Sequence, residues 1–237
     1  MANLGTVVVV GGTCELVKHL AQHYADKGHH VVVTSRDLGR AQVTAKEIGD
    51  DCVGLAVDLA DPHGIANALA GVEDVQHLAL VALYRDNNNV REYKIDDAIQ
   101  LVTLKLVGYT ECVHVLAPKM NEDSSILIYG GLARDQPYPG STTITTVNGG
   151  VSSLINSLAW QLTPIRVNAI HPGQVGDTPA WTVKDQASKA VIDNLISRTM
   201  LGRLVTTEDV THAAIFLLEN RGMTGFNLRV DGGRMIK

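Results

Sequence analysis

Short apolar runs alternate with amphipathic stretches along almost the whole chain. Thr6 to Val10 is almost wholly apolar and β-branched, ends at Gly11-Gly12, and is followed by an amphipathic stretch from Leu16 to Lys27. A short apolar run without polar alternation is typical of a strand buried on both faces, and the spacing after the glycines is helical. The beginning of the chain therefore predicts a strand, a tight turn and a helix.

The same alternation continues to the end of the chain. We predict further strands at 30–34, 52–57, 75–81, 125–129, 165–170 and 226–230, and further helices at 38–48, 62–69, 95–120, 145–162 and 207–218, the last opened by a threonine cap. This order implies parallel strands joined by right-handed crossovers. No repeat, low-complexity run or linker interrupts it. We therefore expect an α/β fold, with a single Rossmann-type, doubly wound parallel sheet flanked by helices in one domain of residues 1–237.

Composition supports a self-sufficient core in a reducing compartment. Hydrophobic residues make up 45% of the 237 residues, which is enough for one domain without disulfides. Cys14, Cys52 and Cys112 are odd in number and have no metal-ligand spacing. We therefore expect neither a disulfide framework nor a metal site, and a cytoplasmic location.

Charge and hydropathy argue against two classes of partner. The net charge is −5 without clustered Lys or Arg, which argues against nucleic acid because such binding depends on neutralising phosphates. The first residues show no basic segment followed by an apolar one, and no apolar stretch reaches the roughly 18 residues that span a bilayer. We expect a protein that is neither secreted nor inserted in a membrane.

Three stretches carry a resemblance to a known family. They are residues 165–173 (IRVNAIHPG), residues 224–233 (TGFNLRVDGG), and residues 105–108 (KLVG) followed by 117–120 (APKM). In this order and at these spacings they resemble the short-chain dehydrogenase/reductase family. The resemblance covers almost the whole chain and implies a dinucleotide-binding fold, although fold alone does not fix the chemistry.

The resemblance places a cofactor phosphate site at Gly11, Gly12 and Thr13. Family members carry a TGxxxGxG turn there, whose glycines let the pyrophosphate approach the backbone at a helix N-terminus. Here Glu15 and Val17 occupy the other two glycine positions. We expect these side chains to weaken dinucleotide binding; the glycines alone are equally compatible with a simple strand-to-helix turn.

Other cofactor positions are better matched. Ser35-Arg36 ends the second predicted strand, where family members that use NAD carry an acid; Arg36 can instead pair with a 2′-phosphate, which favours NADP(H) if a dinucleotide binds. Asp58 and Leu59 match the segment that contacts the adenine, and Asp58 is equally suited to capping the next helix. Pro172-Gly173 matches the family's Pro-Gly turn, whereas Leu83 replaces a glycine that leaves room for the ribose.

The family's catalytic residues are replaced. The resemblance puts Gly131 at the serine that orients the substrate carbonyl, Ile144 at the tyrosine that donates a proton, and Asn148 at the lysine that lowers the tyrosine pKa. The residues that follow Asn148 stay in register, so misalignment does not explain the loss. Tyr84, Tyr129, Tyr138 and His171 lie near the site in sequence, and for each a structural role is the simpler interpretation.

Lys105 stands where the family carries an asparagine on its long central helix, so lysine and asparagine are exchanged between positions 105 and 148. Those positions face one cleft in the family fold. We expect either that Lys105 points into the cleft, where it can bind an anion or act as a base, or that it extends outward to solvent.

Three functions stay open from the sequence. The family resemblance implies an NADP(H)-linked oxidoreductase; the degenerate site suggests a non-redox cyclase, dehydratase or isomerase, or a non-catalytic nucleotide-binding or partner subunit. We expect a small-molecule ligand and, from the family's habit, a homodimer or homotetramer. Residues 176–201 correspond to the family's substrate loop and include Trp181, Met200 and Leu201, which suggests an apolar lid but no particular substrate.

Overall fold

A parallel sheet forms the centre of the protein. The structure is a computed structural model that describes residues 4–82 and 84–236, apart from the side chains of residues 15 and 180. In this part of the chain the strands are β1 (Thr6–Val10), β2 (His30–Ser35), β3 (Cys52–Ala56), β4 (Val75–Leu80), β5 (Met120–Tyr129), β6 (Arg166–Pro172) and β7 (Asn227–Val230). They pair in the order β3-β2-β1-β4-β5-β6-β7, all parallel. The predicted doubly wound sheet is confirmed.

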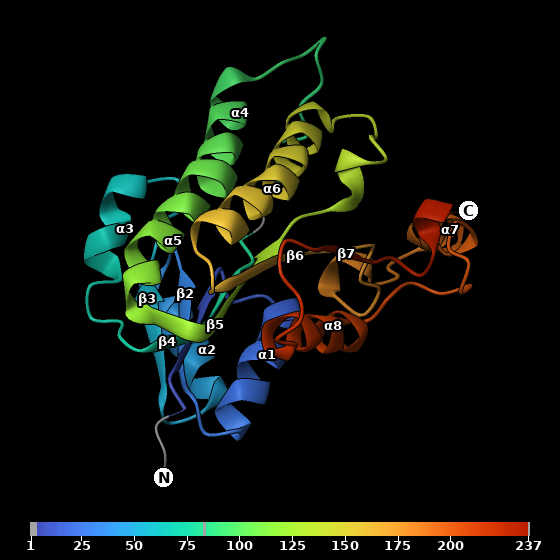
Figure 1. Cartoon of the computed structure of the whole chain (residues 1–237). Helices are drawn as coiled ribbons and strands as arrows, with labels where there is room; N and C mark the ends of the chain where they lie inside the picture. Colours follow the sequence, from blue (N-terminus) through green and yellow to red (C-terminus); the bar gives the residue numbers. More distant parts are fainter. Residues whose placement is uncertain (1–3, 83, 237) are drawn as a thin grey trace.

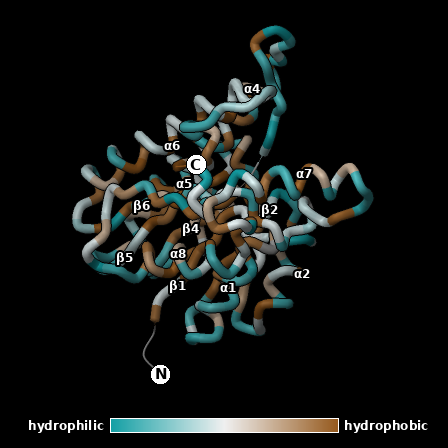
Figure 2. The backbone as a smooth tube through the Cα atoms, turned by 90° about the vertical axis from the view of Figure 1, so that its right-hand side faces the viewer, coloured by the Kyte–Doolittle hydropathy of each residue, from teal (hydrophilic) through white to brown (hydrophobic). Residues whose placement is uncertain are grey.

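Helices cover both faces of this sheet (Figure 1). The helices are α1 (Glu15–Asp26), α2 (Leu38–Ile48), α3 (Pro62–Ala68), α4 (Ile95–Val102), α5 (Tyr109–Leu116), α6 (Thr142–Gln161), α7 (Gln186–Ser197) and α8 (Thr207–Glu219). One layer contains α1, α2 and α8, and the other contains α3, α4, α5 and α6. Hydrophobic segments concentrate in the strands between the layers (Figure 2).

The predicted helix at 95–120 is not continuous. A π-helical segment, η1 (Thr103–Gly108), separates α4 from α5, and a short 3₁₀ segment, η2 (Ala117–Lys119), leads into β5. Apolar residues continue through the π-helical turn, which explains why the interruption is hard to see in the sequence. Strand β5 also begins five residues earlier than predicted, at Met120.

The stretch Ile95–Lys119 is long and apolar enough to cross a membrane by length and composition, which the sequence did not lead us to expect. In this fold it lies across the sheet, and 44% of its most apolar window is buried. Core helices of this kind pass the same test of length and composition.

Helix α7 was not predicted. It lies in the 176–201 segment and begins with a capping box, in which the Asp185 carboxylate accepts a hydrogen bond from the Ser188 backbone N–H. None of its described residues is buried. Met200 and Leu201, expected in an apolar lid, are exposed at its end. Met200 and Leu201 therefore lie on the surface in this structure and do not cover a buried site.

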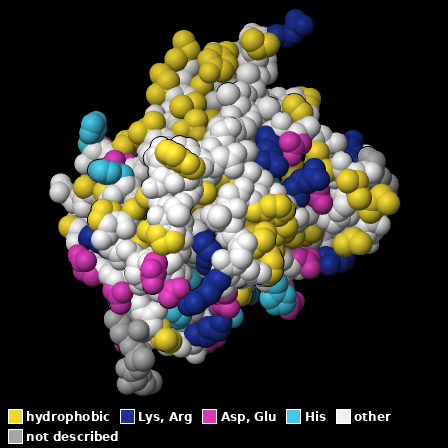
Figure 3. Space-filling view, viewed as in Figure 1, with side chains coloured by type: hydrophobic (Ala, Val, Ile, Leu, Met, Phe, Trp, Pro, Cys, Tyr) yellow, Lys and Arg dark blue, Asp and Glu magenta, His cyan; other side chains and the backbone are white. Residues whose placement is uncertain are grey.

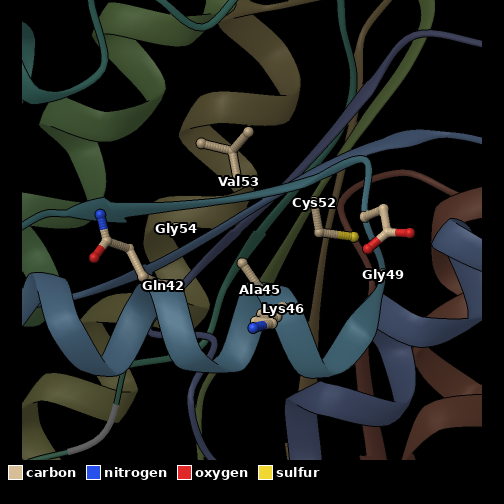
Figure 4. A pocket seen from close by; sticks show the side chains of 8 residues that line it. Gln42, Ala45, Lys46, Gly49, Cys52, Val53 and Gly54 are labelled. Carbon is tan, nitrogen blue, oxygen red and sulfur yellow. The ribbon is translucent and has the colours of Figure 1, made fainter.

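Gly54 on the edge strand β3 lets helix α2 pack closely against the sheet. A Cβ atom added to Gly54 would lie 2.3 Å from the Ala41 backbone carbonyl carbon. Beside this contact is a hollow of about 300 Å³ between the end of α2 and β3, lined by Lys46, Cys52 and their neighbours (Figure 4). Its lining comes from the end of α2, the turn that follows it and the amino end of β3, so it is not at the sheet edge where the site residues were predicted.

Candidate functional site

A second cavity, of about 240 Å³, lies where the strand order reverses between β1 and β4. This is the place at which open α/β sheets bind ligands, at the carboxyl ends of the strands. Its lining residues are Gly11, Thr13, Cys14, Ser35, Arg36, Arg40, Val57, Asp58, Leu59, Val81, Ala82, Tyr84 and Leu104. The structure thus brings together most of the cofactor positions predicted from the sequence.

The glycine turn after β1 is tightly constrained. Gly11 has a φ of +82°, and a Cβ atom there would lie 2.6 Å from the backbone of Ala82 at the end of β4. A Cβ on Gly12 would lie 2.9 Å from the Val9 carbonyl oxygen. Both glycines are therefore required by the turn itself, whether or not a phosphate binds beside them.

Val17 does not obstruct the cavity, contrary to our expectation. Its side chain is completely buried in the core under α1 and is absent from the cavity lining. The reason is that the third glycine of such turns serves helix–strand packing more than phosphate contact. The predicted obstructions at the Glu15 side chain and at Leu83 lie outside the described part of the chain.

Two arginines line the end of this cavity that lies beside β2 and α2. Arg36 follows β2, and Arg40 lies in the first turn of α2, where its backbone N–H donates to the capping carboxylate of Asp37 at 2.6 Å. Both side chains are exposed, and in the described chain no carboxylate forms an ion pair with either. Arg40 was missed from the sequence, because only the fold shows that the first turn of α2 faces this cavity.

Asp58 and Leu59 form the opposite wall. The Asp58 carboxylate accepts a hydrogen bond from the Ala60 N–H at 2.9 Å, so it shapes the turn before α3 rather than capping the helix itself. Leu59 is buried, and its carbonyl packs against Gly108 of the π-helical segment. This wall is therefore positioned by η1.

Pro172 and Gly173 lie at the end of β6 and not in the lining of this cavity. The Gly173 N–H donates to the Val230 carbonyl at 2.8 Å, and a Cβ on Gly173 would lie 3.1 Å from Asp231 Cα. The Pro-Gly turn thus extends the pairing of β6 with β7 by one backbone hydrogen bond. Its expected role in cofactor binding stays a prediction.

The positions that the resemblance aligned with the family's catalytic serine and lysine come together at the carboxyl end of β5. A Cβ atom added to Gly131 would lie 2.8 Å from the side-chain nitrogen of Asn148, which is 3% exposed. The asparagine amide therefore fills the space that a serine side chain would need. Ile144, one turn earlier on α6, packs in a small apolar cluster with Leu101 and Val147.

Lys105 points inward. Its side chain is buried, and its ammonium donates a hydrogen bond to the Tyr129 carbonyl at 3.0 Å and lies 5.8 Å from the centre of the Tyr109 ring. Burial, with a smaller contribution from the positive charge of Arg85, lowers the pKa of Lys105 from 10.5 to about 8. The alternative of a lysine extended to solvent is wrong.

The other candidate groups have structural roles. The His171 Nε2 lies 2.8 Å from the Asn227 side-chain oxygen, and burial lowers the His171 pKa to about 4, so the ring is neutral at pH 7. The Tyr129 hydroxyl is buried without a hydrogen-bond partner among the described residues, and burial raises its pKa. Tyr138 is exposed in a loop. In the described residues no group of His, Cys, Asp and Glu side chains could hold a metal ion.

Comparison with known proteins identifies the class. A family model described as enoyl-(acyl carrier protein) reductase matches residues 16–234. With this match and the parallel sheet, the chain belongs to the short-chain dehydrogenase/reductase family.

Individual relatives cover nearly the whole chain. A 3-oxoacyl-[acyl-carrier-protein] reductase of Mus musculus is 30% identical over 95% of both chains. Among solved structures, the MalC reductase/Diels-Alderase of Malbranchea aurantiaca has a TM-score of 0.89 at 21% identity, covering 99% of this chain and 98% of that one. A small-chain dehydrogenase in complex with NADPH has a TM-score of 0.82 at 23% identity, covering 98% and 99%. These structures share the fold.

Proposed function

We propose that the protein is an NADP(H)-linked oxidoreductase that works without the family's tyrosine proton donor. The observation that carries this proposal is the cavity between the carboxyl ends of β1 and β4, which has Arg36 and Arg40 at its rim. The two guanidinium groups suit a 2′-phosphate, because arginine pairs with phosphate through two parallel N–H bonds. The relative solved with NADPH supports this choice of cofactor.

The residues present fit such a cofactor at its nucleotide end. Arg36 and Arg40 would hold the 2′-phosphate, Asp58 would face the adenine, and Thr13 with the N-terminus of α1 would lie beside the pyrophosphate. A bound NADPH supplies a hydride. Ile144 can neither donate nor accept a proton, so the proton that must follow hydride transfer would come from the Lys105 ammonium or from water.

Removing the arginines tests the cofactor assignment. We expect Arg36→Leu or Arg40→Leu to weaken NADPH binding about tenfold or more, since a charge-assisted hydrogen bond contributes roughly 1.5–3 kcal/mol. NADH, which lacks the 2′-phosphate, should be unaffected. Calorimetric titration measures both, and Arg91→Leu, on an exposed loop, is the matched control. Tight NADH binding by the unmodified protein would contradict the assignment.

A non-redox reaction on the same scaffold is the second candidate. The positions Gly131, Ile144 and Asn148 favour it, because they lack the groups for ordinary ketone reduction. The structural relative MalC is named as both a reductase and a Diels-Alderase, that is, with a redox and a non-redox activity. Turnover of simple ketones with NADPH at rates usual for the family would exclude this candidate, whereas NADPH binding without such turnover would favour it. Failure to bind NADPH would exclude the oxidoreductase and leave this candidate together with a non-catalytic partner subunit.

We propose in addition that the protein forms a homodimer or homotetramer through α4 and α6. Hydrophobic side chains gather over α4 (Figure 3), and Ile95, Ile99, Val102 and Val107 are exposed along α4 and η1. A surface of this kind favours burial against a second copy. We expect light scattering to show an oligomer and Ile99→Asp to shift it to monomer. A monomeric unmodified protein at micromolar concentration would contradict the proposal.

A further inference from the structure

Two arginines lie together at the carboxyl edge of the sheet, in the half away from the cavity between β1 and β4. Arg198 is the C-cap of α7, and Arg234 follows β7 in the short 3₁₀ segment η5 (Arg234–Ile236). The backbone joins the two places, because the Met200 N–H donates to the Gly232 carbonyl at 2.9 Å. The two arginine side chains therefore start from neighbouring segments.

Two glutamines hold the Arg234 side chain in place. Its Nε donates to the Gln136 side-chain oxygen at 2.9 Å, and its Nη1 donates to the side-chain oxygen of Gln174. Gln136 lies between β5 and α6 and Gln174 follows β6, so the segments after β5, β6 and β7 meet here. Because arginine has only donors, the amide oxygens face it and the amide NH₂ groups face away. This spot therefore presents donors from several elements.

Neither Arg198 nor Arg234 forms an ion pair with a carboxylate of the described residues. Asp231 lies near Arg234, but its carboxylate accepts the N–H groups of Gly233 and Met235 at 2.9 and 3.2 Å and so shapes the turn. Partial burial and the positive charge of Arg198 lower the pKa of Arg234, and Asp231 opposes this only in part. Two positive charges thus repel each other here, and a bound anion would relieve the repulsion.

Two other arginines at this end of the sheet are neutralised. Arg134 pairs with Asp135 at 2.9 Å, and Arg203 pairs with Asp209 at 2.6 Å. The unbalanced pair is also open to solvent, since Arg198 is exposed and its partner is half-buried. On the face drawn in Figure 3, basic side chains with acidic ones among them gather between β7 and the C-terminal end. A ligand can therefore reach the pair without any change of the fold.

We propose that Arg198 and Arg234 bind a phosphate monoester group of the substrate. Such a group carries a charge between about −1.5 and −2 at pH 7, which balances two guanidinium groups, whereas a carboxylate balances one. Guanidinium groups pair with phosphate oxygens through parallel N–H bonds, and the Gln136 and Gln174 amides can donate to the remaining oxygens.

The position of the pair suits a substrate rather than the cofactor. The carboxyl ends of β5 and β6 lie between the pair and the cavity lined by Arg36 and Arg40. A ligand held by its phosphate beside β7 can thus extend along the sheet edge toward that cavity. The assignment to a substrate rests on the proposed function, but phosphate binding itself does not require NADP(H).

Phenyl phosphate is the probe, and methyl phenyl phosphate, a diester with one charge fewer, is the control ligand. Both are titrated into the Arg36→Leu/Arg40→Leu double variant, in which the cofactor cavity has lost its phosphate-binding side chains. We expect a Kd of about 1 mM or lower for phenyl phosphate, and binding of the diester at least about fivefold weaker. In NMR spectra the backbone amide signals of Gly233 and Gln174 should shift, whereas that of Gly11 should not.

Arg198→Leu in the same background is expected to weaken phenyl phosphate binding about tenfold, because a charge-assisted interaction is lost. This variant should fold, since Arg198 is exposed and its side chain has no hydrogen bond in the described chain. Arg221→Leu is the charge-matched control. Arg221 is exposed and pairs with Asp123, near the amino end of β5, so its loss should change the affinity by less than about twofold.

Three results would each overturn the inference: equal affinities for monoester and diester, unchanged affinity in Arg198→Leu, or NMR shifts that do not include Gly233. An equal loss of affinity in Arg221→Leu would also overturn it, because it would show only a general attraction to positive charge. Failure of the unmodified protein to bind NADPH would instead affect the cofactor assignment alone, since the titrations contain no NADPH.

Discussion

Gly108→Ala is expected to destabilise the protein by about 3 kcal/mol. A Cβ atom there would lie 2.4 Å from the Leu59 carbonyl oxygen and 3.0 Å from Leu59 Cβ. Backbone atoms cannot move aside as a flexible side chain does, so the π-helical turn or the Leu59 segment must shift, and overpacking of this kind costs roughly 1–3 kcal/mol or more. Chemical denaturation with a two-state fit measures the loss.

Gly149→Ala is the matched control on the neighbouring helix. Gly149 lies in α6, and a Cβ atom there would have no atom within 4 Å. Alanine should therefore stabilise the helix by up to about 1 kcal/mol. If both variants had the same stability, the close approach between η1 and Leu59 would not exist in solution. Because Leu59 lines the cavity between β1 and β4, Gly108→Ala should also weaken NADPH binding if the cofactor binds there.

Acidification should destabilise the fold strongly between about pH 6.5 and pH 4. Burial, with the nearby positive groups His29 and Arg166, lowers the His77 pKa from 6.5 to about 4, and burial also lowers the His171 pKa to about 4. Well above pH 6.5 both histidine rings are neutral in the folded and in the unfolded chain, so they contribute no pH dependence to the free energy of unfolding. As pH falls below 6.5 the unfolded chain takes up protons that the folded chain does not, which costs up to about 3 kcal/mol per histidine by pH 4.

His77→Asn should reduce this pH dependence. His77 Nδ1 lies 2.8 Å from the Ser125 hydroxyl, which donates to the Leu218 carbonyl, so Nδ1 is the donor of the pair and an asparagine amide can replace it. The variant should lose stability at pH 7 from the smaller side chain, yet its stability should fall less between pH 6.5 and 4. His63→Asn, on the exposed surface of α3, should leave the slope unchanged. A slope that is the same in His77→Asn as in the unmodified protein would show that His77 does not titrate as the structure requires.

The sheet was predictable because each strand is a short apolar run with a turn signal at its end. The seven predicted strands all occur, since burial on both faces leaves little room for polar positions. The π-helical turn was not predicted, because residues 95–120 carry apolar side chains at exposed as well as buried positions, and these hide the change of phase that an extra residue introduces. Helix α7 escaped notice for a different reason: Ile192, Leu195 and Ile196 do lie on one face of it, but the family resemblance assigned residues 176–201 to the substrate loop.

The site was predictable only at the level of residue types. Arg36 was expected from its place at the end of β2, whereas Arg40 required knowledge that the first turn of α2 faces the same cavity. The direction of Lys105 depends on the π-helical turn, so the sequence left two alternatives that only the fold separates. Val17 was misjudged because family spacing gives the position of a residue but not the side to which it points.

The contact between Gly131 and Asn148 restricts how this cleft can change over evolutionary time. A serine at position 131 meets the Asn148 amide, so the family's hydroxyl can return only if residue 148 changes or rotates away. A lysine at position 148 would in turn bring a second ammonium toward the cleft that Lys105 already occupies, and like charges in a buried site repel. Positions 131 and 148 therefore constrain each other: a larger residue at position 131 needs a different residue or rotamer at position 148, and a lysine at position 148 needs an uncharged residue at position 105.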